Sequence, residues 1–550
     1  MRKPKVSLFF GAGAEVGYGL PSGGRFALDL FRTPAQEDKA LFRERLAAID
    51  RTSAYAAKWL PDDYLKKRIH VFGRTDFESL MTSSLEYRKD DILAYLDRFD
   101  EHASRLLRGW SIGEDRLRGL YAHETGTPVG QVLYGQAVKL NPRLAESVPL
   151  FQSEFFSAFL HLLELHPGHR ELGRHVRAIL ELLVGSCGQR LIAKLNEELF
   201  ESAPDKLSVF DELSGIFSLN YHHVGQTGME IVLTETPAEI TLDSPLPDMM
   251  AGLARLLLED IYACTLDYQA LIDSHYRYLY NPRAQWAKFT RIAVFLHTVR
   301  RYMMNCGEDR REALANGPGY YHDLAGLAGR ADVQAIGTTN YHYFVEDIIH
   351  GAMPDVPVFH LNGSVGEFYD PYRNVILDGY GDGDRVRGKN GHGDRDGDRD
   401  RVQGKNGHGD RDGDGGPGEL RRDGLTVPFI FTQSGIKPLT SIKMSKRYVE
   451  LYDRFLESDV VCIVGYGFNG DDGHINGLIR ELASSGKPIV ILHYGSGSEA
   501  ALKRHYQGRL RLHGSERLTV LPVGDDRKVG GAIWWEALLE THAGRPSAVV

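Results

Sequence analysis

Apolar positions near both ends of the chain form short runs that stop at turns rich in glycine and asparagine. The first run, Val6–Phe10, leads into Gly11-Ala12-Gly13-Ala14. Similar runs follow from about Asp332 onward, and helical patterns separate some of them. Repeated strand–turn–helix units predict an α/β fold with a doubly wound parallel sheet and ligands at the carboxyl ends of its strands. The later predicted strands are Val333–Thr338, Val356–Leu361, Val460–Val464 and Pro488–Tyr494, and the predicted helices are Tyr343–His350, Tyr448–Glu457 and His474–Ala483.

Between these ends, apolar residues recur at the three- and four-residue spacing of helices. Phe155, Phe156, Phe159 and Leu163 are typical. This spacing predicts a large α-helical insertion over 81–330 whose apolar faces form its own core. The alternative is a surface for a partner or for oligomerisation. A short strand is predicted near Met229–Thr234.

A tandem repeat marks a third kind of segment. Asp384–Asp398 recurs at Asp400–Asp414 with one difference, Arg387 against Gln403. Because the repeat contains almost no apolar residue, it cannot bury a core and is expected to be disordered. The α/β domain is therefore predicted in three parts, 1–80, 331–380 and 421–550, interrupted by the helical insertion at 81–330 and a disordered loop at 381–420.

Charge and composition narrow the class of protein. A net charge of −9 over 550 residues argues against a general nucleic-acid binder. No run of eighteen apolar residues occurs, so no membrane span is expected. The four cysteines form no CxxC pair, which indicates neither a disulfide framework nor a cysteine zinc site. A cytoplasmic location is expected.

The turns carry the candidate chemistry. A buried strand that passes through Gly11-Ala12-Gly13-Ala14 into a helix lets the backbone approach a phosphate. Val16 stands where the third glycine of G-x-G-x-x-G would be. Further motifs follow in order: Gly19-Leu20-Pro21-Ser22, Asp76-Phe77-Glu78, Thr338-Thr339-Asn340-Tyr341, Leu361-Asn362-Gly363-Ser364, Lys443, and Gly465-Tyr466-Gly467-Phe468 with Asp472.

In this order the motifs resemble the sirtuin-like NAD-binding domain, of Rossmann type, in the divergent branch found in bacterial anti-phage defence proteins. The resemblance covers about 1–80 and 330–500. The four-cysteine zinc ribbon of sirtuin deacetylases is missing here, and relatives without it typically hydrolyse NAD to nicotinamide and ADP-ribose. The resemblance implies a regulated NAD hydrolase without a metal, acting in defence by NAD depletion. The alternative is a catalytically dead subunit that binds NAD or a nucleotide signal.

The resemblance also implies partners and site residues. An unregulated NADase would be toxic, so we expect a phage-derived or nucleotide trigger, and a homo-oligomer or a companion defence protein. Asn340 is implied beside the nicotinamide ribose, where an amide can orient water or the ribose. Asp472 has a second interpretation as a cap of the following helix. The implied cofactor-binding residues are Gly11, Ala12, Gly13, Ala14, Glu15, Leu20, Pro21, Ser22, Thr338, Thr339, Gly363, Ser364, Gly465, Tyr466, Gly467, Phe468 and Asp472.

Two positions depart from the family pattern. His342 stands where the family has aspartate, and Asn362 stands where it has the histidine of Leu-His-Gly-Ser. His360 lies two residues earlier, on the same side of the strand by alternation. Either His342 or His360 replaces the missing imidazole, or hydrolysis has decayed and nucleotide binding remains. The candidate catalytic residues are thus Asn340, His342, His360 and Asn362.

Overall fold

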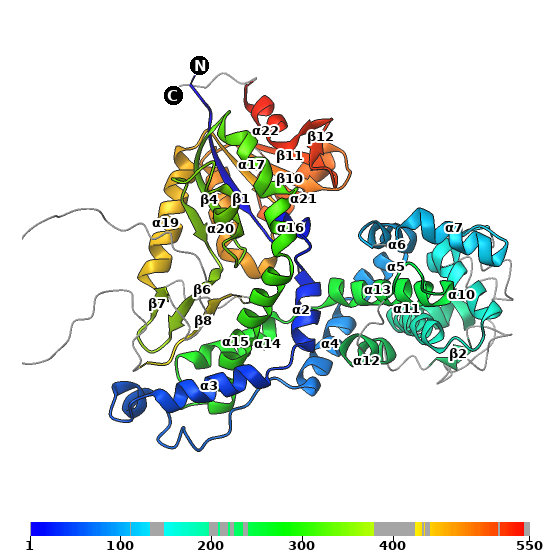
Figure 1. The fold of residues 1–550 in the computed structure, drawn as a ribbon, viewed down its shortest axis with the longest axis horizontal. Helices are drawn as coiled ribbons and strands as arrows, with labels where there is room; N and C mark the ends of the chain where they lie inside the picture. Colours follow the sequence, from blue (N-terminus) through cyan, green and yellow to red (C-terminus); the bar gives the residue numbers. More distant parts are fainter. Residues whose placement is uncertain are drawn as a thin grey trace, which may run out of the picture. The chain divides into compact units, whose positions relative to one another are not determined.

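The chain divides into two compact units, which are described separately (Figure 1). The first comprises Met1–Leu20, Ala35–Val71 and Ile272–Val550, and the second Pro21–Pro34 and Phe72–Leu271. The second unit therefore has different limits from the predicted insertion at 81–330. Ser22 and the predicted loop at 381–420 lie outside the described residues. The computed structural model describes 2–21, 23–110, 112–131, 148–196, 207–208, 218–219, 225–234, 240–378, 424–431, 434, 441–514 and 517–543.

A six-stranded parallel sheet organises the first unit, in the order β11-β10-β9-β1-β4-β5. From β1 the chain moves outward through β4 and β5, then returns to place β9 on the other side of β1. The strand order thus reverses between β1 and β9. The strands confirm the predicted α/β class with a parallel sheet: β1 (Lys5–Phe10), β4 (Asp332–Thr338), β5 (Val358–His360), β9 (Val460–Val464), β10 (Ile489–Tyr494) and β11 (Leu518–Val523).

Helices cover both faces of this sheet, which explains why apolar residues predominate on both faces of its strands. Leu8 and Phe10 of β1 belong to one buried core, while Phe9 belongs to the other. The first core includes residues of α17 (Tyr320–Ala328), α18 (Phe344–Ile349) and α22 (Trp534–Ala543). The second includes residues of α19 (Ile442–Glu457), α20 (Gly473–Ser484) and α21 (Glu499–Leu510). The helices predicted at Tyr343–His350, Tyr448–Glu457 and His474–Ala483 are confirmed as α18, α19 and α20.

A smaller antiparallel sheet, not predicted from the sequence, follows β5 in the order β7-β6-β8. Its strands are β6 (Gly363–Asp370), β7 (Val375–Asp378) and β8 (Val427–Ile430), and α15 (Trp286–Asp309) packs against β6 and β8. The remaining elements of this unit are α1 (Gly13–Val16), α3 (Gln36–Ala48), η1 (Tyr55–Trp59), η3 (Arg277–Leu279), α16 (Arg311–Asn316), η4 (Gly470–Asp472), β12 (Lys528–Val529) and β13 (Ala532–Ile533).

The described part of the second unit is mostly helical. The strand predicted near Met229–Thr234 is wrong: these residues belong to helix α12, and Ile231 and Val232 are fully buried there. Helix α13 carries buried residues along its whole length. The elements are α2 (Gly23–Arg32), α4 (Arg74–Tyr87), α5 (Lys89–Leu96), α6 (Phe99–Arg108), α7 (Glu114–Thr125), η2 (Pro149–Gln152), α10 (Glu154–Leu165), α11 (Arg170–Asn196), β2 (Leu207–Ser208), β3 (Ser218–Leu219), α12 (Gln226–Thr234) and α13 (Leu246–Thr265), with α14 (Gln269–Tyr276) spanning the boundary.

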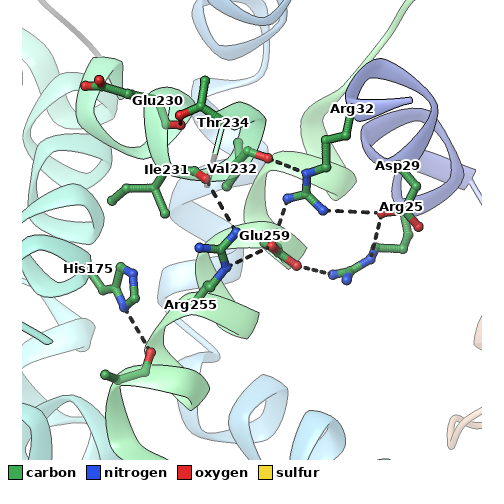
Figure 2. Close-up of polar contacts among 11 residues, drawn as sticks. Arg25, Asp29, Arg32, His175, Glu230, Ile231, Val232, Thr234, Arg255 and Glu259 are labelled. Carbon is green, nitrogen blue, oxygen red and sulfur yellow. Dashed lines mark hydrogen bonds and ion pairs between the residues drawn. The ribbon is translucent and has the colours of Figure 1, made fainter. Parts of the chain in front are cut away.

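A buried carboxylate, Glu259 of α13, ties three elements of this unit together (Figure 2). Its side chain is 1% exposed and forms ion pairs with Arg25 and Arg32 of α2 and with Arg255 one turn earlier. Burial disfavours the charged carboxylate, but the three arginines outweigh it and lower the pKa of Glu259. Arg32 also donates to the backbone carbonyl of Val232, so the cluster links α2, α12 and α13.

Candidate functional site

The candidate site lies at the carboxyl edge of the parallel sheet, where the strand order reverses between β1 and β9. In open α/β sheets, ligands bind outside the carboxyl ends of the strands at such a reversal. The turn after β1 begins at Gly11, and the turn after β9 begins at Gly465. The structure therefore brings these two predicted turns together at the position where a ligand is expected.

Close backbone packing accounts for the glycines of both turns. Gly11 donates from its backbone N to the carbonyl of Val464 at 2.9 Å, and Gly13 donates to the carbonyl of Gly465 at 2.8 Å. A Cβ on Gly11 would lie 2.5 Å from the carbonyl oxygen of Gly465, and one on Gly465 would lie 2.2 Å from the backbone N of Ala14. Gly465 also has a φ of 65°, which favours glycine. The spacing of the glycines thus follows from the contact between the turns, and the N–H of Gly13 is already engaged.

Asn340 links the turn after β4 to the turn after β1. Its Nδ2 donates to the carbonyl oxygen of Gly11 at 3.2 Å and to Tyr321 Oη at 2.9 Å, and the residue is 5% exposed. The carbonyl of Gly11 can only accept, so this contact fixes the orientation of the amide. Both amide hydrogens are then used, and Oδ1 is the group that Asn340 can offer to a ligand.

The contact with Tyr321 continues to a buried carboxyl group, Glu15 of α1. Because Asn340 donates to Tyr321 Oη, the tyrosine hydroxyl directs its own proton to Glu15 Oε1 at 3.0 Å. Burial raises the pKa of Tyr321, so this hydroxyl keeps its proton. Burial also raises the pKa of Glu15 to about 7, although the bond from Tyr321 and the charge of His360 oppose it. Glu15 therefore changes its charge near neutral pH.

His360 lies at the end of β5 and holds the same turn from the other side. Its Nδ1 lies 2.8 Å from the backbone oxygen of Asn340 and its Nε2 lies 2.7 Å from Glu346 Oε1. A backbone carbonyl only accepts, so Nδ1 carries a proton, and the second contact then also contains a proton, shared with Glu346. Burial disfavours the charged imidazole, but the carboxylate of Glu346 outweighs it and raises the pKa of His360. His360 thus positions the backbone of Asn340.

His342 contacts the helix α15. Its Nε2 lies 2.8 Å from the backbone oxygen of Met303, and its ring stacks on Phe344 with centroids 4.3 Å apart. Nε2 must therefore be the protonated nitrogen. Burial lowers the pKa of His342 to about 4, so the ring is neutral at physiological pH. Among the described residues, its buried Nδ1 has no hydrogen-bond partner.

The turn after β5 is held by packing on the antiparallel sheet. Asn362 is buried and its Nδ2 lies 3.5 Å from Asp472 Oδ1. Gly363 has a φ of 78°, and a Cβ there would lie 1.9 Å from the carbonyl oxygen of Phe429. Ser364 Oγ lies 2.6 Å from Tyr343 Oη. The Asn-Gly-Ser sequence therefore has a structural explanation in addition to the predicted cofactor-binding one.

The aromatic residues after β9 point into the core. Tyr466 packs edge-on against Phe9 and donates from its Oη to Asn476 Oδ1 at 3.0 Å. Phe468 is 2% exposed. Since both rings are buried, a ligand at this turn would meet the exposed Gly467 instead. Asp472 has no side-chain cap bond to α20, so its interpretation as a helix cap is not supported.

The other predicted residues lie around the turns after β1 and β4. Thr338 Oγ1 donates to the carbonyl of Phe10 and accepts from the backbone N of Asn340, both at 3.0 Å. Thr339 also donates from its backbone N to Phe10. Ala12 is exposed, whereas Ala14 and Leu20 are buried. Pro21 belongs to the second unit.

Sequence reasoning missed Tyr321 and Glu346, which complete the two hydrogen-bonded chains around Asn340. Glu346 lies in the first turn of the helix predicted at Tyr343–His350, directly after the turn that contains Asn340, so its proximity to that turn could have been inferred. Tyr321 precedes β4 in a helix whose apolar pattern gives no sign of a polar contact.

No family model matches the chain, and no curated protein matches it. Within the described ranges, no three His, Cys, Asp or Glu side chains come together as a metal site. None of the helices in those ranges is long and apolar enough to span a bilayer. The chemistry of the site is thus that of an amide oxygen on Asn340, a carboxyl group on Glu15 that titrates near neutrality, and a protonated His360–Glu346 pair.

Proposed function

We propose that this chain binds NAD at the carboxyl edge between β1 and β9 and hydrolyses it to nicotinamide and ADP-ribose. The observation that carries the proposal is the position of Asn340 beside the strand reversal, with its amide fixed by Gly11 and Tyr321. The resemblance of the turn motifs to sirtuin-like domains supplies the choice of NAD. It also supplies the proposed role, NAD depletion in anti-phage defence under control of a trigger or a partner.

Hydrolysis of NAD requires few catalytic groups from the protein. Water attacks the anomeric carbon of the ribose, the bond to the nicotinamide nitrogen breaks, and nicotinamide leaves as a neutral base. Oδ1 of Asn340 accepts a hydrogen bond from the water or a ribose hydroxyl and so orients it. One proton is released, and Glu15, with its pKa raised to about 7, is the nearby carboxyl group suited to receive it.

A second candidate function is a nucleotide-binding subunit without turnover. It is favoured by the engagement of both imidazoles, since His342 and His360 each contact a backbone carbonyl. Both nitrogens of His360 are engaged, and the remaining nitrogen of His342, Nδ1, is buried in a ring whose pKa burial lowers to about 4, so neither ring offers a base of ordinary strength. In this case the site would bind NAD or a related nucleotide as a signal.

Release of nicotinamide from NAD by the purified full chain, with and without phage lysate or candidate partners, separates the two functions. Calorimetry with NAD gives binding independently. We expect turnover that is lost in Asn340→Ala and reduced in Tyr321→Phe, which removes the hydroxyl between Asn340 and Glu15. Tyr262→Phe is the matched control, because it removes a buried tyrosine hydroxyl bonded to Gly225 in the second unit. Binding without turnover under every condition would favour the second function, and neither binding nor turnover would exclude both.

A further inference from the structure

Helix α19 carries an apolar stripe on the side that faces away from the sheet. Ile442 is 71% exposed, Val449 60% and Leu456 36%. These residues are spaced by seven, so they lie on one side of the helix over about 21 Å. The opposite side packs on β1 and β4 through residues such as Leu451 and Phe455, which are fully buried. Figure 1 shows α19 lying along one face of the sheet.

The charged residues of α19, apart from the exposed Glu457 at its last position, fall into two groups. Lys443 and Arg447 form ion pairs with Glu367 of β6, and Glu450 pairs with Arg454 one turn later. Lys446 and Asp453 are exposed and flank Val449, one turn before it and one turn after it. Within the described part of the chain, neither of these two forms an ion pair.

These two residues cannot neutralise each other on one helix, because a separation of seven residues is about 10.5 Å along the axis. An antiparallel copy of α19 resolves this. When Val449 meets Val449 at a two-fold axis, Ile442 faces Leu456 of the other copy and Lys446 lies beside its Asp453. In a parallel copy this flank of one helix would lie on the opposite side of the contact from the same flank of the other, so Lys446 would meet neither Asp453 nor Lys446 of the other copy.

We propose that a second copy of this chain docks on the exposed face of α19, with the two helices antiparallel. The contact is isologous, because each copy contributes the same stripe and the same two charges. Three apolar side chains make a small contact compared with the roughly 1,200 Å² that a stable interface buries. The dimer is therefore expected to dissociate on dilution. This inference does not depend on the proposed function.

Sedimentation velocity of the full chain over a range of concentrations tests the charge pairing. We expect a dimer whose dissociation constant rises at least tenfold in Val449→Glu and in Lys446→Glu. The double variant Lys446→Glu with Asp453→Lys should restore association, because the exchanged charges still meet their opposites across the two-fold axis. Leu165→Glu is the control, since it charges an exposed leucine of the second unit. A monomer at every concentration, or a double variant as weak as Lys446→Glu, would overturn the proposal.

Disulfide formation tests the geometry separately. In a background with the exposed Cys264 changed to serine, Val449→Cys should form an intermolecular disulfide under mild oxidation. Ile442→Cys should form little, because residue 442 faces residue 456 of the other copy. Efficient cross-linking through Ile442→Cys would indicate a parallel pair and contradict the proposal, as would the absence of cross-linking through Val449→Cys.

Discussion

Replacing Glu15 by glutamine should make the unfolding free energy of the first unit fall less as pH rises. The folded-state pKa of Glu15 is about 7, above its ordinary value of 4.5, because the carboxyl group is buried. Below about pH 4.5 it is protonated in both the folded and the unfolded chain and has no effect on stability. As pH rises, the unfolded chain releases its proton first, so stability falls with pH until the folded pKa is passed. Glutamine keeps the acceptor for Tyr321 and removes this titration.

The size of the effect follows from the shift. A difference of about 2.5 pH units corresponds to about 3.4 kcal/mol of lost stability well above pH 7, at 1.36 kcal/mol per unit. About 1.4 kcal/mol of this loss is already present at about pH 5.5. The stability gained on Glu15→Gln should therefore increase by about 2 kcal/mol between about pH 5.5 and about pH 8.5. Taking the difference between the two proteins cancels groups that titrate alike in both.

Urea unfolding followed by tryptophan fluorescence can isolate the first unit. The chain has five tryptophans, and Trp110 belongs to the second unit. On a Trp110→Phe background, the remaining tryptophans, Trp59, Trp286, Trp534 and Trp535, all report on the first unit. If the difference in unfolding free energy between Glu15→Gln and its parent is the same at both pH values, Glu15 does not have a raised pKa. The assigned direction of the hydrogen bonds from Asn340 through Tyr321 to Glu15 would not be affected.

Three further outcomes test other parts of the structure. Gly465→Ala should lower the free energy of unfolding by about 3 kcal/mol or more, because its Cβ would meet the backbone N of Ala14. Gly467→Ala should be tolerated, because the nearest atom to its Cβ is 3.4 Å away. Urea unfolding of the two variants compares them. Glu259→Gln should destabilise the second unit by about 3–5 kcal/mol, since it removes the buried carboxylate that Arg25, Arg32 and Arg255 share and leaves Asp29 to pair with Arg25 and Arg32; hydrogen exchange in α13 should detect the loss. Glu346→Gln should destabilise the chain most at about pH 5.5–6.5 and less at about pH 9. The reason is that Glu346 raises the pKa of His360, and the stabilisation from a raised histidine pKa is lost as pH rises through that pKa. A loss of unfolding free energy that does not depend on pH, measured by urea unfolding, would contradict the pairing.

The sequence predicts the parallel sheet well because its strands have a distinctive pattern. A strand buried on both faces must be largely apolar: β9 is apolar over its whole length, and β1 is apolar except at Lys5 and the buried Ser7. The pattern fails where burial does not distinguish strand from helix. Ile231 and Val232 are β-branched and follow one another, which favours a strand, yet contacts with α11 and α13 bury them in a helix.

Only part of the candidate site could be predicted from the sequence. The order of turn motifs indicated that Gly11, Asn340 and Gly465 lie near one another, and the strand order brings all three to one edge of the sheet. The roles of the two histidines depend on tertiary contacts. A sequence cannot show that the nitrogen of His342 meets the carbonyl of Met303, or that His360 meets Glu346, because backbone carbonyls and helix orientation carry no residue signature.

The contacts of the turn after β1 change the interpretation of its glycines. In the sequence, Gly11 and Gly13 indicate room for a phosphate. In the structure, that room is filled by the backbone of Gly465, so the glycines would be needed even without a ligand. A phosphate at this edge would instead meet the exposed Ala12 and Gly467. The same packing fixes the carbonyl of Gly11, which in turn fixes the amide of Asn340. The glycine turn therefore supports the proposed chemistry indirectly, because it leaves Oδ1 as the atom of Asn340 that can accept a further hydrogen bond.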